Sequence, residues 1–109
     1  MRYLLLYFVD EAIDTPQGAP DPALDVWLER WRDSGVLLHG DRLRPTADAA
    51  TVRRRGAETL VSDGPFAETK EQVAGYDLIE CDDLEAALEI ASGHPAAALG
   101  TVEVRPIWT

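Results

Sequence analysis

The chain begins with a continuously apolar segment from Tyr3 to Val9, which constrains the fold more than any other part of the sequence. Tyr and Val are strong strand formers, so this segment is predicted to be a β-strand. Successive side chains of a strand point to opposite faces of the sheet. Both sets are apolar here, with Tyr3, Leu5, Tyr7 and Val9 on one side and Leu4, Leu6 and Phe8 on the other.

A sheet with one face in water alternates apolar and polar residues, so both faces of this strand are expected to be covered. The helices that connect the strands can cover only one of these faces. The simplest cover for the second face is the same face of a second copy of the chain, which gives a two-fold homodimer. A long loop over a central strand is the alternative.

The first helix is predicted from its caps and from the spacing of its apolar residues. Asp14 to Pro22 is rich in Pro and Gly and is predicted to be a loop. Asp21 can cap a helix with Pro22 in its first position, and Gly35 ends it. One face of this helix is apolar at three- and four-residue spacing: Leu24, Trp27, Leu28 and Trp31. The two tryptophans are therefore predicted to be core residues and not a ligand stack.

Strands and a second helix are predicted along the rest of the chain. The further strands are expected at residues 36–38, 51–55, 58–62, 73–81 and 101–107. The helix is expected to follow an Asp82 or Asp83 cap and to stop at Gly93, with another helical turn before the last strand. Thr69 and Gln72 have capping-box spacing, which predicts a helical turn there as well.

The reduced order of elements is β-α-β-β-α-β, with an extra β-hairpin arm around Gly56 in the middle. This order is typical of the α+β ferredoxin-like fold, in which helices cover one face of an antiparallel sheet. The length of 109 residues predicts one domain, residues 1–109.

The charge of the chain excludes two classes of partner. A formal net charge of -10 argues against nucleic acid, whose phosphates require a basic face, and against an anionic membrane surface. No run of residues approaches transmembrane length. The apolar start has a single basic residue and lacks a small-residue cleavage site, so it is interpreted as a strand and not as a signal peptide.

Cys81 is the single cysteine of the chain, so no intrachain disulfide forms, which favours a reducing, cytoplasmic location. It ends an apolar run, where a thiol is expected to be buried and inert. No Cys and His spacing indicates a metal site, and no cofactor is predicted.

Asp63 is the candidate catalytic residue. It ends a predicted strand and precedes Gly64 and Pro65, and a residue before proline is restricted to extended conformations. A carboxylate held on such a turn suits a general base. The alternative is structural, because an aspartate at the start of a turn accepts backbone N–H bonds without any substrate.

Candidate ligand-binding residues follow this turn. Lys70 could hold an anion or lower the pKa of the Asp63 carboxyl, or could simply be solvated. Phe66 and Tyr76 could line a pocket, the tyrosine with its hydroxyl as a polar contact, or could pack in the core. His94 lies in the loop before the last strand and suits proton transfer, although a loop histidine is commonly just exposed.

Other polar residues are open to two interpretations. His39 could line a pocket if it faces the interior, and otherwise lies on the surface or is satisfied inside. Arg53 to Arg55 form a short basic run that could bind an anion or an acidic partner, but a solvated hairpin is the simpler interpretation.

The segment from Val61 to Tyr76, which contains Asp63-Gly64-Pro65-Phe66, resembles the signature of the DGPF family of YciI-related proteins. The segment from Gly100 to Ile107 is similar to the family's C-terminal sequence. The resemblance implies a dimeric α+β barrel, and it favours a functional role for Asp63, the aspartate of the name-giving motif. A His–Asp pair that YciI-like proteins carry is absent, because His94 replaces its aspartate and Leu24 its histidine.

Two functions are compatible with this resemblance. Related dimeric barrels include cofactor-free oxygenases and isomerases, so the first is binding of a small organic molecule between sheet and helices, with or without cofactor-free catalysis. The second is a non-catalytic dimeric accessory or regulatory protein, since DGPF-like proteins are often encoded beside extracytoplasmic-function sigma factors.

Overall fold

The computed structural model describes residues 1–13 and 21–108. Its elements are β1 (Arg2–Val9), α1 (Pro22–Asp33), β2 (Leu37–Arg42), the 3-10 helix η1 (Thr46–Asp48), β3 (Ala50–Arg55), β4 (Glu58–Asp63), β5 (Gln72–Glu80), α2 (Leu84–Ser92), α3 (Ala96–Leu99) and β6 (Thr101–Pro106). The predicted α+β class is confirmed. Most of the predicted loop Asp14 to Pro22 lies outside the described residues.

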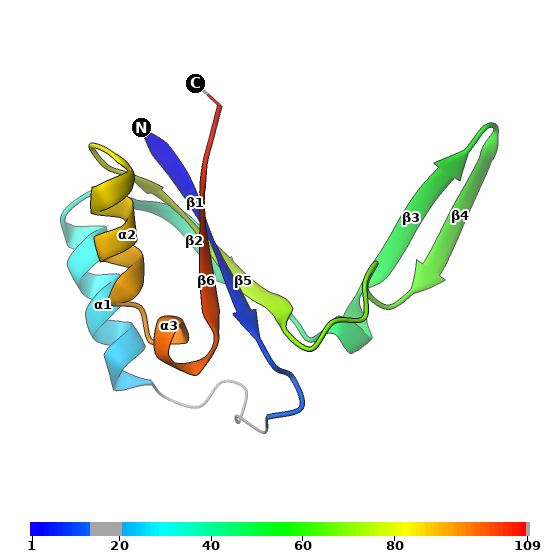
Figure 1. Ribbon diagram of the computed structural model, residues 1–109, viewed down its shortest axis with the longest axis horizontal. Coiled ribbons are helices and arrows are strands. Elements are labelled where there is room, and N and C mark those ends of the chain that lie inside the picture. Colours follow the sequence, from blue (N-terminus) through cyan, green and yellow to red (C-terminus); the bar gives the residue numbers. More distant parts are fainter. Residues whose placement is uncertain (14–20, 109) are drawn as a thin grey trace.

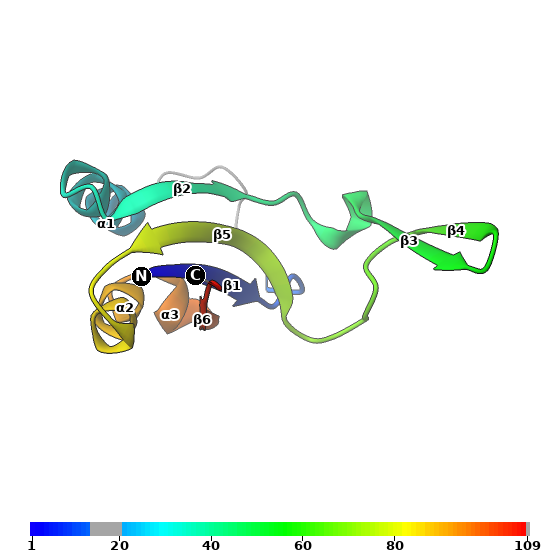
Figure 2. The same cartoon turned by 90° about the horizontal axis from the view of Figure 1, so that it is seen from above.

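Four strands of the described residues form an antiparallel sheet in the order β2-β5-β1-β6. Figure 1 shows α1, α2 and α3 on one side of this sheet and the β3–β4 ribbon projecting on the other side. Seen from above, the ribbon extends well beyond the end of the sheet (Figure 2). We call this ribbon, residues 50–63, the arm; it is the predicted extra hairpin.

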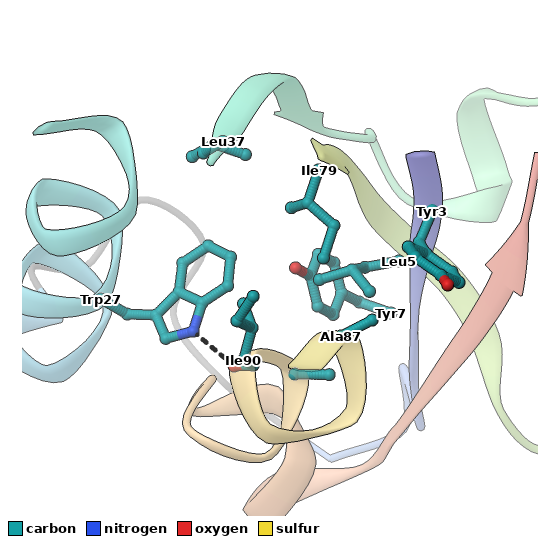
Figure 3. Packing of buried hydrophobic residues seen from close by; sticks show 9 residues of the cluster. Tyr3, Leu5, Tyr7, Trp27, Leu37, Ile79, Ala87 and Ile90 are labelled. Atoms are coloured by element: carbon teal, nitrogen blue, oxygen red, sulfur yellow. Dashed lines mark hydrogen bonds between the residues drawn. The ribbon is translucent and has the colours of Figure 1, made fainter. Parts of the chain in front are cut away.

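The core lies between the sheet and the helices (Figure 3). The central strands of the sheet, β1 and β5, supply the fully buried Leu5 and Ile79, and Ala87 of α2 is buried with them in the core. The buried hydrophobic cluster comprises Tyr3, Leu5, Tyr7, Trp27, Leu37, Ile79, Ala87, Ile90 and Ala91. One face of the four-stranded sheet is thus covered within the chain.

Among the described residues, no helix covers the other face of the sheet (Figure 1). This face is apolar along the central strands β1 and β5 and carries polar side chains on the edge strands β2 and β6, among them His39 and Glu103. Along β1, Tyr3, Leu5 and Tyr7 are buried, whereas the alternating residues are only half-buried. Cross-strand register places further side chains from β5 on the same side as these half-buried residues. We call this the open sheet face: Leu4, Leu6, Phe8, Tyr76 and Leu78.

The prediction that the two tryptophans of α1 are core residues is confirmed for Trp27 and only in part for Trp31. Trp27 is only 4% exposed, and its indole Nε1 donates a 2.9 Å hydrogen bond to the backbone oxygen of Ile90 in α2. Trp31 is half-buried against the core, with the guanidinium carbon of Arg30 lying 4.6 Å from its ring centroid. Trp31 is therefore less buried than a full core position.

The predicted caps form as expected. The Asp21 side chain accepts from the backbone N–H groups of Ala23 and Leu24, and Pro22 opens α1. Gly35 follows the end of α1 with a φ of +79°, a conformation that glycine adopts at low cost. Of the two candidate caps for α2, Asp83 is the one used.

The structure differs from the sequence interpretation in two places. The strand predicted at residues 36–38 is longer, because β2 continues to Arg42 by pairing with β5. The helical turn predicted at Thr69 is wrong. The Gln72 amide instead donates to the backbone oxygens of Ala67 and Thr69, and Gln72 itself begins β5. The Thr69 hydroxyl donates to the backbone oxygen of Glu71, so both side chains that a capping box would use make other hydrogen bonds in this loop.

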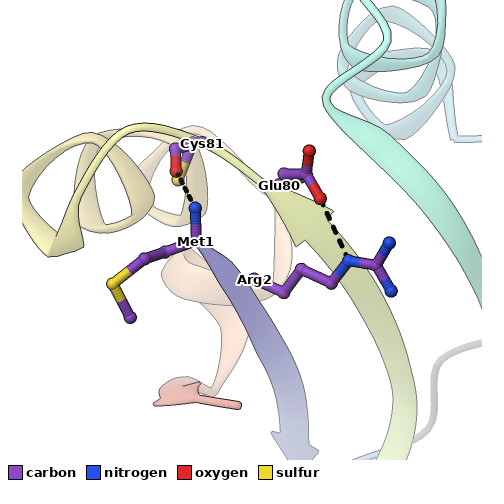
Figure 4. A network of polar contacts seen from close by, with 4 residues as sticks. All are labelled: Met1, Arg2, Glu80 and Cys81. Atoms are coloured by element: carbon purple, nitrogen blue, oxygen red, sulfur yellow. Dashed lines mark hydrogen bonds and ion pairs between the residues drawn. The ribbon is translucent and has the colours of Figure 1, made fainter. Parts of the chain in front are cut away.

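Polar contacts join the start of β1 to the end of β5 (Figure 4). The terminal ammonium of Met1 donates to the backbone oxygen of Cys81 at 3.0 Å, and Arg2 Nε lies 3.0 Å from Glu80 Oε2. The ion pair is exposed, so we expect it to contribute little to stability.

Candidate functional site

The structure places Asp63 and Phe66 on and beside the arm, away from the core. Asp63 ends β4 opposite Ala50 and is exposed. Phe66 is 74% exposed, and the guanidinium of Arg53 lies 4.8 Å from its ring centroid. Gly64 has a φ of +93° and donates through its N–H to the backbone oxygen of Ala49, which closes the base of the arm. This turn gives the Asp63-Gly64-Pro65 motif a visible structural role.

Lys70 and Tyr76 lie in two other places. Lys70 lines a shallow pocket of about 370 Å³ with acidic neighbours that include Glu11 and Glu68. Tyr76 lies on the open sheet face, where its hydroxyl is 2.8 Å from Nε2 of His39. The same His39 nitrogen lies 3.8 Å from Asp41 Oδ2, so His39 belongs to an exposed polar group on β2. The structure therefore does not gather these candidates around Asp63.

His94 is buried, and it joins two residues that the sequence interpretation missed. Its imidazole stacks on the ring of Tyr7, with centroids 4.1 Å apart and planes 20° apart. The Tyr7 hydroxyl donates a 2.5 Å hydrogen bond to Oδ2 of Asp77. Asp77 and His94 are 6% and 9% exposed and are the buried polar residues of the described chain. We call Tyr7, Asp77 and His94 the polar cluster.

The position of Asp77 depends on a glycine in the neighbouring strand. Gly40 of β2 pairs with Asp77 of β5. An ideal Cβ on Gly40 would lie 1.7 Å from Asp77 Oδ1 and 2.6 Å from the backbone oxygen of Tyr76. The carboxylate thus occupies the space that any other residue at position 40 would fill.

Burial shifts the pKa of each member of the polar cluster. Desolvation raises the pKa of the Asp77 carboxyl, while the Tyr7 hydrogen bond and the charge of Arg32 partly oppose this rise. Desolvation, followed by the hydrogen bond to Asp77, raises the pKa of Tyr7. Desolvation lowers the pKa of His94 to about 4, against a smaller opposing effect of Asp21. His94 is therefore neutral at physiological pH.

Backbone contact also fixes the tautomer of His94. The N–H of Ala96 donates to Nδ1 of His94 at 3.0 Å. Since Nδ1 acts as the acceptor and the ring is neutral, the proton is on Nε2. The cluster thus holds a neutral imidazole N–H donor, a phenol and a carboxyl group in one place.

A groove of about 650 Å³ lies between α1 and α2, which we call the α1–α2 groove. Its apolar lining includes Trp27, Trp31, Val36, Ala86 and Ile90, and its charged lining residues are Arg30, Glu80, Asp82 and Glu89. Trp27, which lines the groove, lies edge-on to His94 with ring centroids 4.7 Å apart. One wall of the groove thus contacts the polar cluster directly.

Cys81 also lines this groove and is half-buried. Burial raises the pKa of its thiol, which keeps it protonated. The expected burial of this thiol is therefore met only in part, while its raised pKa favours the unreactive protonated form, since thiolate is the nucleophile.

The missed residues left a signal in the sequence. Asp77 interrupts the otherwise apolar segment from Val73 to Ile79, and it lies on the same face of the strand as the core residue Ile79. An acidic residue at a core position of a strand is rarely buried without a partner. Its partner Tyr7 lies on the covered side of β1, but the pairing of β1 with β5 was needed to bring the two together.

Fold and site together define an α+β protein with helices on one sheet face and a buried Tyr–Asp–His cluster beside an interhelical groove. The family model of the YCII-related domain matches residues 1–109, and the chain belongs to this family. This confirms the relationship that the Val61 to Tyr76 segment predicted.

An uncharacterised protein of Rhizobium meliloti (strain 1021) is 38% identical to the chain over 114 residues, which cover 98% of the chain and 92% of that protein. Across the described residues, no helix is long and apolar enough to cross a membrane. Residues 1–13 and 21–108 also contain no group of three or more His, Cys, Asp or Glu side chains placed to hold a metal ion.

Proposed function

We propose that the protein binds a small organic molecule in the α1–α2 groove, with the polar cluster lying behind Trp27 of its inner wall. The observation that carries the proposal is the contact between Trp27, which lines the groove, and His94. Ligand pockets are typically apolar and aromatic with a few convergent polar groups, and this groove has that composition.

The chemistry that this arrangement supports is proton transfer without a cofactor. Neutral His94 offers an N–H donor, and Asp77 is a carboxyl of raised pKa hydrogen-bonded to a phenol. Groups with perturbed pKa values next to a pocket are candidates for acid–base roles. Asp63 stays a second candidate base, exposed on the arm. Neither Asp63 nor the polar cluster is among the described residues that line the groove, but His94 contacts the lining residue Trp27, whereas Asp63 lies on the arm.

The proposal is tested by a thermal-shift screen of small carboxylic acids, ketones and aromatic compounds. Specific binding raises the melting temperature, because a ligand of the native state stabilises it. Ala86→Leu should fill the groove and remove the shift of a true ligand, since Ala86 lines it on α2. Leu99→Ser on α3 is the control and should keep the shift, since Leu99 is 69% exposed and the described residues that line the groove do not include it. A compound that shifts both variants like the wild type would contradict binding in the groove.

We also propose that the protomer is ferredoxin-like and pairs through the open sheet face as a dimeric α+β barrel. The strand order β2-β5-β1-β6 supports the ferredoxin-like topology. Leu4, Leu6 and Leu78 on the open sheet face support the dimer. If this face were in water, polar residues would be expected at these positions, in alternation with the apolar residues of the covered face. A cytoplasmic location stays a prediction from the single cysteine.

A second candidate function is that of a non-catalytic accessory protein, regulatory and linked to an extracytoplasmic-function sigma factor. Exposed apolar side chains on and beside the arm favour it, among them Val61 at 68% and Phe66 at 74% exposure. Binding of the purified protein to such a sigma factor, lost on removal of the arm, would support this function over ligand binding.

A further inference from the structure

The arm is a two-stranded ribbon without a sheet of its own. Among the described residues, β3 and β4 pair with each other and not with the four-stranded sheet. A solitary two-stranded ribbon is marginally stable in water, and it gains stability when it packs against another surface. The arm therefore needs a surface that the described part of a single chain does not provide.

Both faces of the arm carry exposed apolar side chains. Val52 and Val61 form a cross-strand pair on one face and are 66% and 68% exposed. Leu60, 48% exposed, lies opposite Arg53 on the other face, where the Arg53 guanidinium also reaches the ring of Phe66. Adjacent exposed apolar residues of this kind mark interaction surfaces.

The charge of the arm is opposite to that of the rest of the chain. Residues 50–63 contain three arginines, Arg53 to Arg55, and two acidic residues, Glu58 and Asp63. The remaining residues contain seven basic and eighteen acidic side chains. An arm of this composition is complementary to the body of another copy of the same chain.

The direction of the arm agrees with this partner. Figure 1 shows the arm on the side of the sheet opposite α1, α2 and α3, which is the side of the open sheet face. A second copy that docks on this face would lie on the same side as the arm. Pairing of two arms is disfavoured, because it would bring their arginine runs together.

We propose that the arm packs against the acidic body of a second copy of the chain and strengthens the dimer. Val52 and Val61 supply the apolar contact, and Arg54, on the same face, supplies a charge contact. Arg53 and Arg55, on the opposite face, add to the positive charge that attracts the arm to an acidic body. This inference rests on the dimer proposed above but is independent of ligand binding in the α1–α2 groove.

Sedimentation equilibrium at several protein concentrations and at low and high salt tests it. The double change Val52→Ser/Val61→Ser should raise the dimer dissociation constant at least tenfold. Changing Arg53 to Arg55 to Ser should also raise it and remove most of its salt dependence. Leu99→Ser is the matched control, since Leu99 is 69% exposed on the helix side, and it should leave the constant unchanged.

Trypsin cleavage of the wild-type protein gives a second readout that needs no variant. If the arm packs against a second copy, cleavage after Arg53 to Arg55 slows as the concentration rises through the dimer range. The inference would be overturned if the arm variants had the wild-type dimer dissociation constant, or if the rate of cleavage did not depend on protein concentration. Either result would still be compatible with a dimer through the open sheet face. A wild-type protein that is monomeric at every concentration would overturn both.

Discussion

The Tyr7 hydroxyl reaches Asp77 diagonally across the β1–β5 pair, with a donor–acceptor distance of 2.5 Å. In the register of this pair Tyr7 lies opposite Gly75, and Leu5 lies opposite Asp77. An ideal Cβ on Gly75 would meet Tyr7 Cδ2 at an ordinary 3.7 Å, whereas the backbone oxygen of Asp41 on β2 would lie 3.0 Å from it. The Tyr7–Asp77 hydrogen bond gives the buried carboxyl a partner, without which its burial would cost free energy.

We expect Tyr7→Phe to destabilise the protein by about 1–3 kcal/mol at pH 7, because it leaves Asp77 buried without its donor. Urea unfolding measures the difference in free energy. Tyr3→Phe is the matched control, since the Tyr3 hydroxyl on the same face of β1 makes a weak 3.9 Å contact with the Met1 sulfur, and it should cost about 0.5 kcal/mol. Equal losses in the free energy of unfolding would show that the Tyr7–Asp77 hydrogen bond stabilises the protein no more than the contact removed in the control.

His94 should make stability depend on pH. Its folded pKa of about 4 lies below its ordinary value of 6.5, so the unfolded chain binds a proton first as the pH falls. The contribution of His94 to the free energy of unfolding is therefore fully present above pH 6.5 and is lost as the pH falls toward 4. The lowering of the pKa from 6.5 to about 4 corresponds to a loss of about 3 kcal/mol, at 1.36 kcal/mol per pKa unit.

Protonation of Asp77, whose folded pKa is raised, has the opposite effect at the acidic end. The comparison is therefore made with His94→Gln, which does not titrate, in urea unfolding between pH 4 and 7.5. The variant should lack the loss of stability below pH 6.5 that the wild type shows. Parallel curves for the two proteins would contradict a buried neutral His94.

Gly40→Ala should destabilise the protein by about 1–3 kcal/mol or more, because a Cβ would overlap the Asp77 carboxylate and the Tyr76 carbonyl. Gly93→Ala is the control, since the nearest atoms to its Cβ would lie at an ordinary 3.7 Å. Thermal unfolding should separate the two variants clearly. A tolerated alanine at position 40 would mean that the carboxylate can move away without cost.

The two tryptophans of α1 should differ in their contribution to stability. Trp27→Ala removes a buried ring and its hydrogen bond to Ile90, and should cost about 3–5 kcal/mol. Trp31 is only half-buried, so Trp31→Ala should cost less. Chemical denaturation measures both, and a larger loss for Trp31 would contradict the burial of these residues.

Local patterns in the sequence were sufficient for much of the fold. The two-sided apolar pattern of Tyr3 to Val9, the Asp21 cap and the hairpin at Gly56 each depend on neighbouring residues, and all are present. The prediction of a helical turn at Thr69 was wrong, because the Gln72 side chain donates hydrogen bonds to the backbone of the loop and does not complete a capping box.

The polar cluster could not be predicted in the same way. Tyr7, Asp77 and His94 come from β1, β5 and the segment after α2, and the pairing of distant strands brings them together. The sequence pointed to His94 as a lone histidine in a loop, because nothing local shows that Tyr7 stacks on it. The same limit applies to Asp63, whose position on the arm follows from the pairing of β3 and β4.

The central claim, that small molecules bind in the α1–α2 groove beside His94, is tested most directly by the indole N–H signals in ¹H–¹⁵N NMR. Trp27 and Trp31 line the groove, whereas Trp108 is 99% exposed and serves as an internal reference. A compound from the thermal-shift screen should move the Trp27 and Trp31 signals in a saturable way and leave Trp108 unchanged. A compound that stabilises the protein while both groove signals stay in place would contradict the claim.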